Sequence, residues 1–321
     1  PNRRSHAPMQ KYCRMGSRNT SCKRNICHLP TSGEQQNNNV TNKTTMEQLK
    51  ALNKSPFEKI MIPSIKNMIM VSSGKGGVGK STVAAGIALS LAKKGYSVGL
   101  MDADIYGPSV PTLFNLKDER PVTIELDGKT KIEPFIRFGI KVNSLGFLID
   151  PMQAVLWRGP MASNAIKQLM NDTHWGELDF LIIDTPPGTG DIHLTFLQQF
   201  EITGTIIVTT PQLVALDDVQ KTISMFKNER VGVPVLGIVE NMAWFTPSKH
   251  PEEKYFLFGR GGGEKLSKIF NVPLIAQIPI NENICQSCDE GKLDILFDDD
   301  EVKTAFSNLT DALLDQLKTK A

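Results

Sequence analysis

The 321-residue sequence predicts an α/β fold, with a doubly wound, mostly parallel sheet and helices on both faces. Three observations lead to this prediction. A strand, a glycine-rich loop and a helix follow one another between residues 68 and 95, apolar strands alternate with helical stretches beyond them, and acidic residues end two of the strands. With 40% hydrophobic residues, the chain from residue 66 onward is long enough to bury one large core. We therefore expect a single domain over residues 66–321.

The first of these elements is a phosphate-binding loop. Residues 74–81 fit the pattern G-x-x-x-x-G-K-[ST] at every fixed position. Residues 68–72 have the composition of a buried strand, and Val83, Ile87 and Leu91 recur at helical spacing after the loop. Backbone amides in such a loop surround a polyphosphate at the positive end of the helix dipole. The expected nucleotide-binding residues of this segment are Gly74, Lys75, Gly76, Gly77, Val78, Gly79, Lys80, Ser81 and Thr82.

The same glycines also satisfy G-x-G-x-x-G, the pattern of a dinucleotide-binding fold. That pattern does not require Lys80 and Ser81, and it gives no role to the acidic strand ends. We therefore expect ATP with Mg²⁺, with Lys80 neutralising the outer phosphates and Ser81 coordinating the metal.

Acidic residues follow two further apolar strands. Residues 98–102 lead to Asp102 and Asp104, one of which is expected to orient the attacking water. Residues 178–184 end in Asp184, which we expect to hold Mg²⁺ together with Ser81. The run Pro-Pro-Gly-Thr-Gly after Asp184 cannot begin a helix at once, so a helix-capping role for this aspartate is disfavoured. Between these strands, Asp127 and Gly128 predict a small hairpin.

Four segments occur in a characteristic order, namely residues 72–81, 102–109, 156–161 and 184–191. With them, the chain from about residue 66 to its end resembles the Mrp/ApbC family of iron–sulfur cluster carriers, which are deviant P-loop ATPases related to MinD and ParA. The resemblance implies that Asp104 is the water-orienting aspartate and that Asn241 recognises adenine. It also implies that Lys75 reaches the nucleotide of a second copy, so that ATP drives formation of a homodimer. The implied catalytic residues are therefore Lys75, Lys80 and Asp104.

The function implied by this resemblance is slow ATP hydrolysis coupled to the transfer of iron–sulfur clusters to apoproteins. The family holds its cluster with a C-x-x-C pair shortly after the segment that matches residues 239–242, but residues 242–251 contain no cysteine. Cys285 and Cys288 form such a pair elsewhere and are our candidate cluster ligands, although two cysteines alone complete no cluster site and a coincidental pair is the alternative. The alternative function is a metal-free ATPase switch of the MinD or ParA type that positions a protein partner.

The first 65 residues differ in composition from the rest. They contain 11 Lys and Arg against 3 Asp and Glu, whereas residues 66–321 contain 25 against 31. Without apolar periodicity, residues 1–65 are predicted to be a basic, disordered tail, and a transit peptide is the alternative. A nucleic-acid-binding arm is disfavoured because aromatic residues are nearly absent. Cys13, Cys22, Cys27 and His28 lack the paired spacing of a zinc site.

Five cysteines without a disulfide framework indicate a reducing compartment. We expect the cytoplasm, or an organelle matrix if the tail is a transit peptide. No segment is long and apolar enough to cross a bilayer, so we expect no membrane partner. Near the C-terminus, Phe306, Leu309, Leu313 and Leu317 form one helical stripe, which is expected to pack on the domain rather than on lipid.

Overall fold

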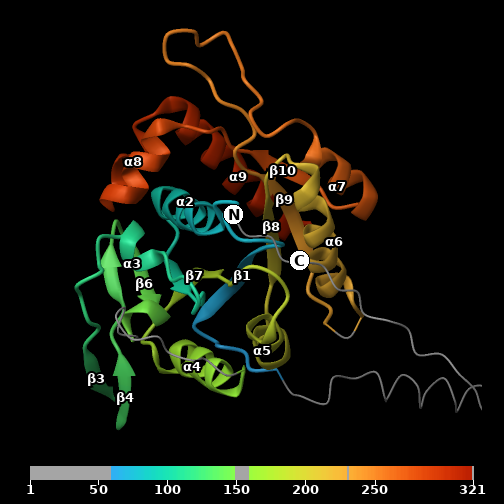
Figure 1. Cartoon of the computed structure of the whole chain (residues 1–321). Helices are drawn as coiled ribbons and strands as arrows, with labels where there is room; N and C mark the ends of the chain where they lie inside the picture. The colour runs from blue at the N-terminus through green and yellow to red at the C-terminus, as the bar shows by residue number, and fades with distance from the viewer. Residues whose placement is uncertain (1–58, 149–158, 230, 320–321) are drawn as a thin grey trace, which may run out of the picture. The chain divides into compact units, whose positions relative to one another are not determined.

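A central sheet of eight strands organises the protein, and helices cover both of its faces (Figure 1). The computed structural model describes residues 59–148, 159–229 and 231–319, which belong to one compact unit. From one edge to the other, the strands are β10 (Leu274–Gln277), β9 (Val235–Glu240), β8 (Gly204–Thr209), β1 (Ile65–Ser73), β7 (Leu178–Asp184), β2 (Val98–Asp102), β6 (Ile140–Ser144) and β5 (Phe135–Arg137). All neighbouring pairs are parallel except β5 and β6. The predicted fold class is confirmed.

Most of the helices lie between strands along the chain, and the last two follow the final strand, β10. They are α2 (Lys80–Lys93), α3 (Val110–Leu113), α4 (Gly159–Asp172), α5 (Asp191–Gln199), α6 (Leu213–Lys227), α7 (Gly262–Phe270), α8 (Glu282–Glu290) and α9 (Asp300–Lys318), with 3-10 turns η1 (Leu145–Phe147) and η2 (Leu293–Phe297). The predicted hairpin is present as β3 (Thr123–Leu126) and β4 (Lys129–Ile132), and its turn residue Asp127 has a φ of 51°. None of the helices in the described ranges is long and apolar enough to cross a membrane.

Strand β1 shows why the sheet is buried on both sides. Its side chains alternate, so Ile69 and Val71 join a core formed with α2, α3, α8 and α9. Met68 and Met70 join a second core formed with α4, α5, α6 and α7. A strand with apolar side chains on both faces is typical of a parallel sheet between two helical layers.

The C-terminal helix packs as its sequence predicts. In α9, Phe306, Leu309 and Leu313 are completely buried, and Leu317 packs against the same core. The apolar stripe of α9 therefore faces the domain.

The order of the strands brings the predicted functional segments to one edge of the sheet. The chain leaves β1 toward β2 on one side, and it later places β8, β9 and β10 on the other side of β1. Strand β7 inserts between β1 and β2, so that Asp184 pairs with Val71 on one side and with Asp102 on the other. In sheets of this kind, a ligand usually binds at the carboxyl ends of the strands, at the point where the order of the strands changes direction.

Candidate nucleotide-binding site

The predicted phosphate-binding loop forms a cradle between the end of β1 and the start of α2. Gly77 and Gly79 have φ values of 78° and 79°, in the left-handed region that favours glycine. A β-carbon on Gly79 would lie 2.2 Å from the side-chain nitrogen of Asn241, so larger residues are also excluded by space. The loop opens into a cavity of about 590 Å³, at the amino end of α2, where unpaired backbone amides attract an anion.

Lys80 lies at the base of this cavity between two carboxylates. Its Nζ donates to Asp184 Oδ1 at 2.5 Å and lies 3.8 Å from Asp104 Oδ2. It also donates to the Ser81 hydroxyl at 3.3 Å. The Lys80 side chain is 7% exposed, so its charge is little screened by water. The structure thus brings together Lys80, Asp104 and Asp184, which are expected to neutralise the outer phosphates, to orient water and to hold Mg²⁺, respectively.

Asp184 has the properties of a magnesium ligand. It is fully buried, and burial raises the pKa of its carboxyl even though Lys80 opposes that shift. Its Oδ2 has no hydrogen-bond partner among the described residues, and a buried oxygen in that state calls for a ligand. Mg²⁺ binds through few protein oxygens, and Asp184 together with the nearby Ser81 hydroxyl fits that requirement.

The two aspartates after β2 occupy different environments. Asp104 lines the cavity and accepts the amides of Tyr106 and Gly107, each at 3.2 Å. Asp102 lies behind it and accepts the amides of Asp104 and Val110. Burial and the neighbouring Asp184 charge raise the pKa of Asp102 to about 7. Asp104 is therefore placed to contact a ligand, whereas Asp102 holds the segment that carries it.

A buried hydrogen-bonded group joins the segment after β7 to the end of β1, which leads into the phosphate-binding loop. The Thr185 hydroxyl donates to the Val71 carbonyl at 3.0 Å, and it lies 3.1 Å from both Ser72 Oγ and His193 Nε2. Because this hydroxyl has one proton, Ser72 and His193 must donate to it, which assigns the His193 proton to Nε2. Nearby, the Gly188 amide donates to the Ser73 carbonyl at 2.8 Å.

His193 is the residue of this region that the sequence analysis missed. It is 1% exposed, and its Nδ1 has no hydrogen-bond partner among the described residues. Burial, with a smaller effect of the Lys80 charge, lowers the pKa of His193 to about 4. The imidazole is therefore neutral at physiological pH. The available signal was a histidine on the apolar side of α5, beside Ile192 and Phe196, which indicates a core histidine.

Asn241 lines a second cavity of about 390 Å³, which shares Gly79 with the phosphate cavity. Its backbone amide donates to the Thr209 carbonyl, and its side chain donates to the Val78 carbonyl at 2.9 Å. The second cavity is lined by Gly79, Thr82, Asn241, Met242, Phe258, Pro279, Ile280, Asn281, Ile284, Cys285, Cys288 and Asp289. Its mainly apolar side chains and its position beside the loop fit a nucleotide base.

Lys75 also lines the phosphate cavity, but its ammonium turns toward α6. Its Nζ donates to Gln212 Oε1 at 3.4 Å. None of the ion pairs in the described part of the chain includes Lys75. Its charge is therefore not committed to a carboxylate.

The two candidate cluster ligands lie in α8, in the walls of these cavities. Cys285 is exposed and lines the second cavity, whereas Cys288 is 9% exposed and lines both. The Cys288 sulfur lies 3.7 Å from Thr82 Oγ1, and burial raises the pKa of its thiol. Neither cysteine belongs to a preformed group of three metal-ligating side chains in the described residues.

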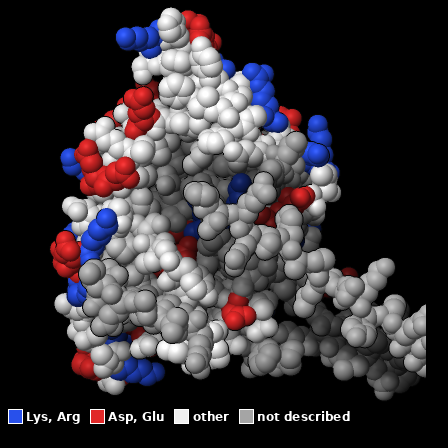
Figure 2. Space-filling view, in the orientation of Figure 1, with Lys and Arg blue, Asp and Glu red and all other residues white. Residues whose placement is uncertain are grey.

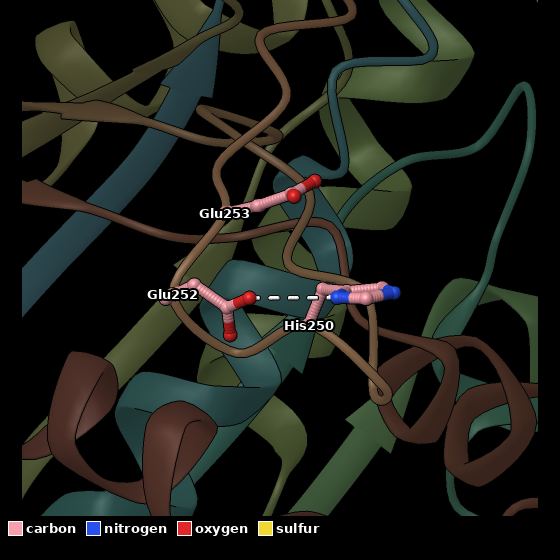
Figure 3. A group of neighbouring side chains, drawn as sticks. All are labelled: His250, Glu252 and Glu253. Carbon is pink, nitrogen blue, oxygen red and sulfur yellow. Dashed lines mark hydrogen bonds and ion pairs between the residues drawn. The ribbon is translucent and has the colours of Figure 1, made fainter.

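A group of that kind occurs on the loop between β9 and α7, drawn in orange at the top of Figure 1. There His250 Nδ1 lies 3.4 Å from Glu252 Oε1, with Glu253 nearby (Figure 3). All three side chains are exposed, and further ligands from the described residues do not join them. Exposed side chains like these hold a metal ion only weakly, because water solvates both the ion and its ligands.

Some sequence predictions concern residues outside the described ranges. These are residues 1–58, with Cys13, Cys22, Cys27 and His28, and the first part of the segment 156–161. On the described surface, Lys, Arg, Asp and Glu are interspersed over the face in Figure 2.

Comparisons with known proteins agree with this geometry. The sequence profile described as "ParA: NUBPL iron-transfer P-loop NTPase" matches residues 64–314, which is most of the chain. The chain belongs to this family. Its sequence is 44% identical over 267 residues to an iron-sulfur cluster carrier protein of Aquifex aeolicus, a match that covers 82% of this chain and 71% of that protein. It is 46% identical over 235 residues to the iron-sulfur cluster transfer protein NUBPL of Dictyostelium discoideum, covering 73% and 71%. The predicted family is thereby confirmed.

Solved structures place this NUBPL-family chain among P-loop NTPases. A nucleotide-binding protein of Archaeoglobus fulgidus in complex with ADP is 38% identical, with a TM-score of 0.64, and the match covers 76% of this chain and 93% of that one. MinD of Pyrococcus horikoshii, complexed with Mg-ADP, is 22% identical with a TM-score of 0.57, covering 82% and 99%. The second likeness concerns the fold alone.

Proposed function

We propose that this chain forms an ATP-dependent homodimer that binds an iron–sulfur cluster and transfers it to apoproteins, with slow hydrolysis of ATP. The observation that carries the proposal is the meeting of Lys80, Asp104 and Asp184 at the base of the phosphate cavity, in a member of an iron-transfer family. Relatives named as cluster carrier or transfer proteins support the choice of cargo. The ADP complex of the Archaeoglobus relative supports the choice of nucleotide.

The residues of the cavity divide the work of phosphoryl transfer, which needs positioning and neutralisation of charge more than covalent chemistry. The loop amides and the amino end of α2 hold the phosphates. Lys80, which is paired with Asp184, has a second anion to neutralise when phosphate enters. Mg²⁺, when bound, would supply further positive charge, and Ser81 and Asp184 would hold it. Asp104 accepts a hydrogen bond from the attacking water and orients it.

The cargo is tested by anaerobic reconstitution of the full chain with iron and sulfide, followed by visible absorbance and counting of bound iron. Cys285 and Cys288 are the proposed cluster ligands, so the Cys285→Ser/Cys288→Ser variant should bind no cluster. The matched control removes the other thiols as Cys13→Ser/Cys22→Ser/Cys27→Ser and should retain it. A cluster that persists in the first variant overturns the assignment of these ligands.

The second candidate function is a metal-free ATPase switch that positions a protein partner. It is favoured by one observation, the lack of cysteine in residues 242–251, where the resemblance implies the cluster ligands. Absence of a cluster from both the wild-type chain and the control variant, with ATP hydrolysis retained, would support the switch and refute carriage.

A further inference from the structure

Two thiols lie in the walls of the cavities that would hold a nucleotide. Cys288 lines both the phosphate cavity and the second, more apolar cavity, while Cys285 lines the second one. The Cys288 sulfur contacts Thr82, which follows Ser81 in the first turn of α2. Both cysteines therefore border the space that a nucleotide would fill.

Helix α8, which carries both thiols, is held firmly in place. Asn281 caps it by accepting the Asn283 amide at 2.8 Å, and both side-chain amides donate to Asp299 Oδ2, at 3.0 and 2.8 Å. At the other end, Gly291 stops the helix with a φ of 64°. Because these bonds tie the amino end of α8 to Asp299, an attached group is not easily accommodated by moving that end away from the cavity.

The environments of the two thiols differ, and this sets the order in which they react. Cys285 is exposed, and its sulfur lies 3.8 Å from Asp289 Oδ2. Cys288 is buried, and burial raises the pKa of its thiol, so less of the reactive thiolate is present. Reagents that reach the cavity therefore meet Cys285 first.

We propose that Cys285 and Cys288 form a modification site for low-molecular-weight disulfides, and that occupation of this site and nucleotide binding exclude each other. In the reaction, the Cys285 thiolate attacks one sulfur of the disulfide, the disulfide bond breaks, and the other half leaves as a thiolate. The disulfide is the oxidant, and the product is a mixed disulfide whose added half lies in the second cavity. This inference rests on the proposed function, since it requires that the two cavities hold the nucleotide.

The test uses the full chain, glutathione disulfide as the probe, and peptide-resolved mass spectrometry. Binding of ADP to the unmodified chain is measured first by equilibrium dialysis. The rate of modification of the peptide that contains Cys285 is then followed with and without ADP. At an ADP concentration one hundred times its dissociation constant, about 1% of sites are free, so the rate should fall about 100-fold.

Cys13, Cys22 and Cys27 serve as internal controls, because they belong to the same chain and lie far from Cys285 in the sequence. Their rates should not change with ADP. Conversely, the chain modified at Cys285 should bind ADP more weakly, and reduction with dithiothreitol should restore binding. The inference is overturned, and the proposed function is not, if ADP slows modification equally at all cysteines or binds without slowing modification of Cys285. A chain that binds no ADP overturns both the inference and the proposed function.

Discussion

Lys80 is the residue on which the charge balance of the cavity depends. It is the cation beside Asp184, which is fully buried, and it also faces Asp104. Without it, Asp184 would be an unpaired buried carboxylate, a situation that costs about 3–5 kcal/mol of folding free energy. The same lysine is expected to neutralise the outer phosphates, so this one side chain contributes both to stability and to activity.

We therefore expect Lys80→Ala to abolish ATP hydrolysis and to lower the free energy of unfolding at pH 7 by about 3–5 kcal/mol. Urea unfolding and phosphate release measure the two effects. The matched variant Lys80→Ala/Asp184→Asn removes both charges and should recover much of the stability without recovering hydrolysis. Wild-type turnover in Lys80→Ala would show that this cavity is not the hydrolytic site.

His193 is expected to make the free energy of unfolding depend on pH. In the unfolded chain a histidine binds its proton near pH 6.5, whereas folded His193 binds one only near pH 4. Between these values the unfolded state holds more protons, so the contribution of His193 to stability is complete above pH 6.5 and is lost as the pH falls toward 4. Over this interval of 2.5 pH units the loss is about 3 kcal/mol.

The variant His193→Gln lacks this titration but keeps a side-chain amide that can donate to Thr185. We expect the difference in unfolding free energy between wild type and variant to shift by about 3 kcal/mol toward the variant from pH 7 to pH 4. Asp102 titrates with the opposite sign because its pKa is raised, but it is present in both proteins and cancels in the difference. A difference that is independent of pH would contradict the assignment of a neutral buried imidazole.

The sequence alone predicted the residues whose role depends on their neighbours in the chain. The glycines, Lys80 and Ser81 form one continuous motif, and Asp104 and Asp184 follow apolar strands directly. By contrast, Cys288 meets Thr82 across 206 positions, and Thr185, which lies within hydrogen-bond distance of His193, meets Ser72 across 113. Contacts between such distant positions are set by the packing of whole elements, so spacing in the sequence did not reveal them.

At the scale of elements, the contact between α2 and α9 shows how a glycine can determine packing. A β-carbon on Gly86 of α2 would lie 2.1 Å from Cε1 of Phe306 in α9. Phe306 is completely buried and packs edge-on against Phe297 at a centroid distance of 5.9 Å. The phenyl ring thus occupies the space that a side chain at position 86 would need.

We expect Gly86→Ala to destabilise the protein by about 1–3 kcal/mol through overpacking, although alanine favours a helix by about 1 kcal/mol over glycine. Thermal or urea unfolding measures the change. The double variant Gly86→Ala/Phe306→Leu makes room for the new methyl group, so its loss should be smaller than the sum of the two single losses. Additive effects would mean that the two residues do not compete for the same space.

The elements also show which parts of the topology a sequence can reveal. Apolar runs predicted the strands, and the stripe of Phe306, Leu309 and Leu313 predicted that α9 packs on the domain. The insertion of β7 between β1 and β2 was not predictable from those runs, because all three strands are apolar on both faces. It is this insertion that brings Asp184 beside Asp102.

At the scale of the whole molecule, the positive charge of Lys75 has no carboxylate partner in the described part of a single chain. Lys75 lines the phosphate cavity, and its Nζ has only the neutral Gln212 side chain as a hydrogen-bond partner in the described part of the chain. A lysine at the mouth of a phosphate site is suited to an anion that arrives from outside. In the proposed homodimer, that anion is the phosphate of the nucleotide bound to the facing copy.

This arrangement gives the last prediction. Each charged hydrogen bond contributes about 1.5–3 kcal/mol, and a twofold dimer contains two of them. Lys75→Ala should therefore raise the dissociation constant of the ATP-bound dimer by at least about 100-fold. Sedimentation with a non-hydrolysable ATP analogue follows the change from the 35.5 kDa chain to its dimer. Lys66→Ala is the matched control, because Lys66 pairs with Asp179 near the other end of the central strands and should leave the dimer intact. An unchanged dimer population in Lys75→Ala, with ATP still bound, would remove this lysine from the interface and favour a role within its own subunit.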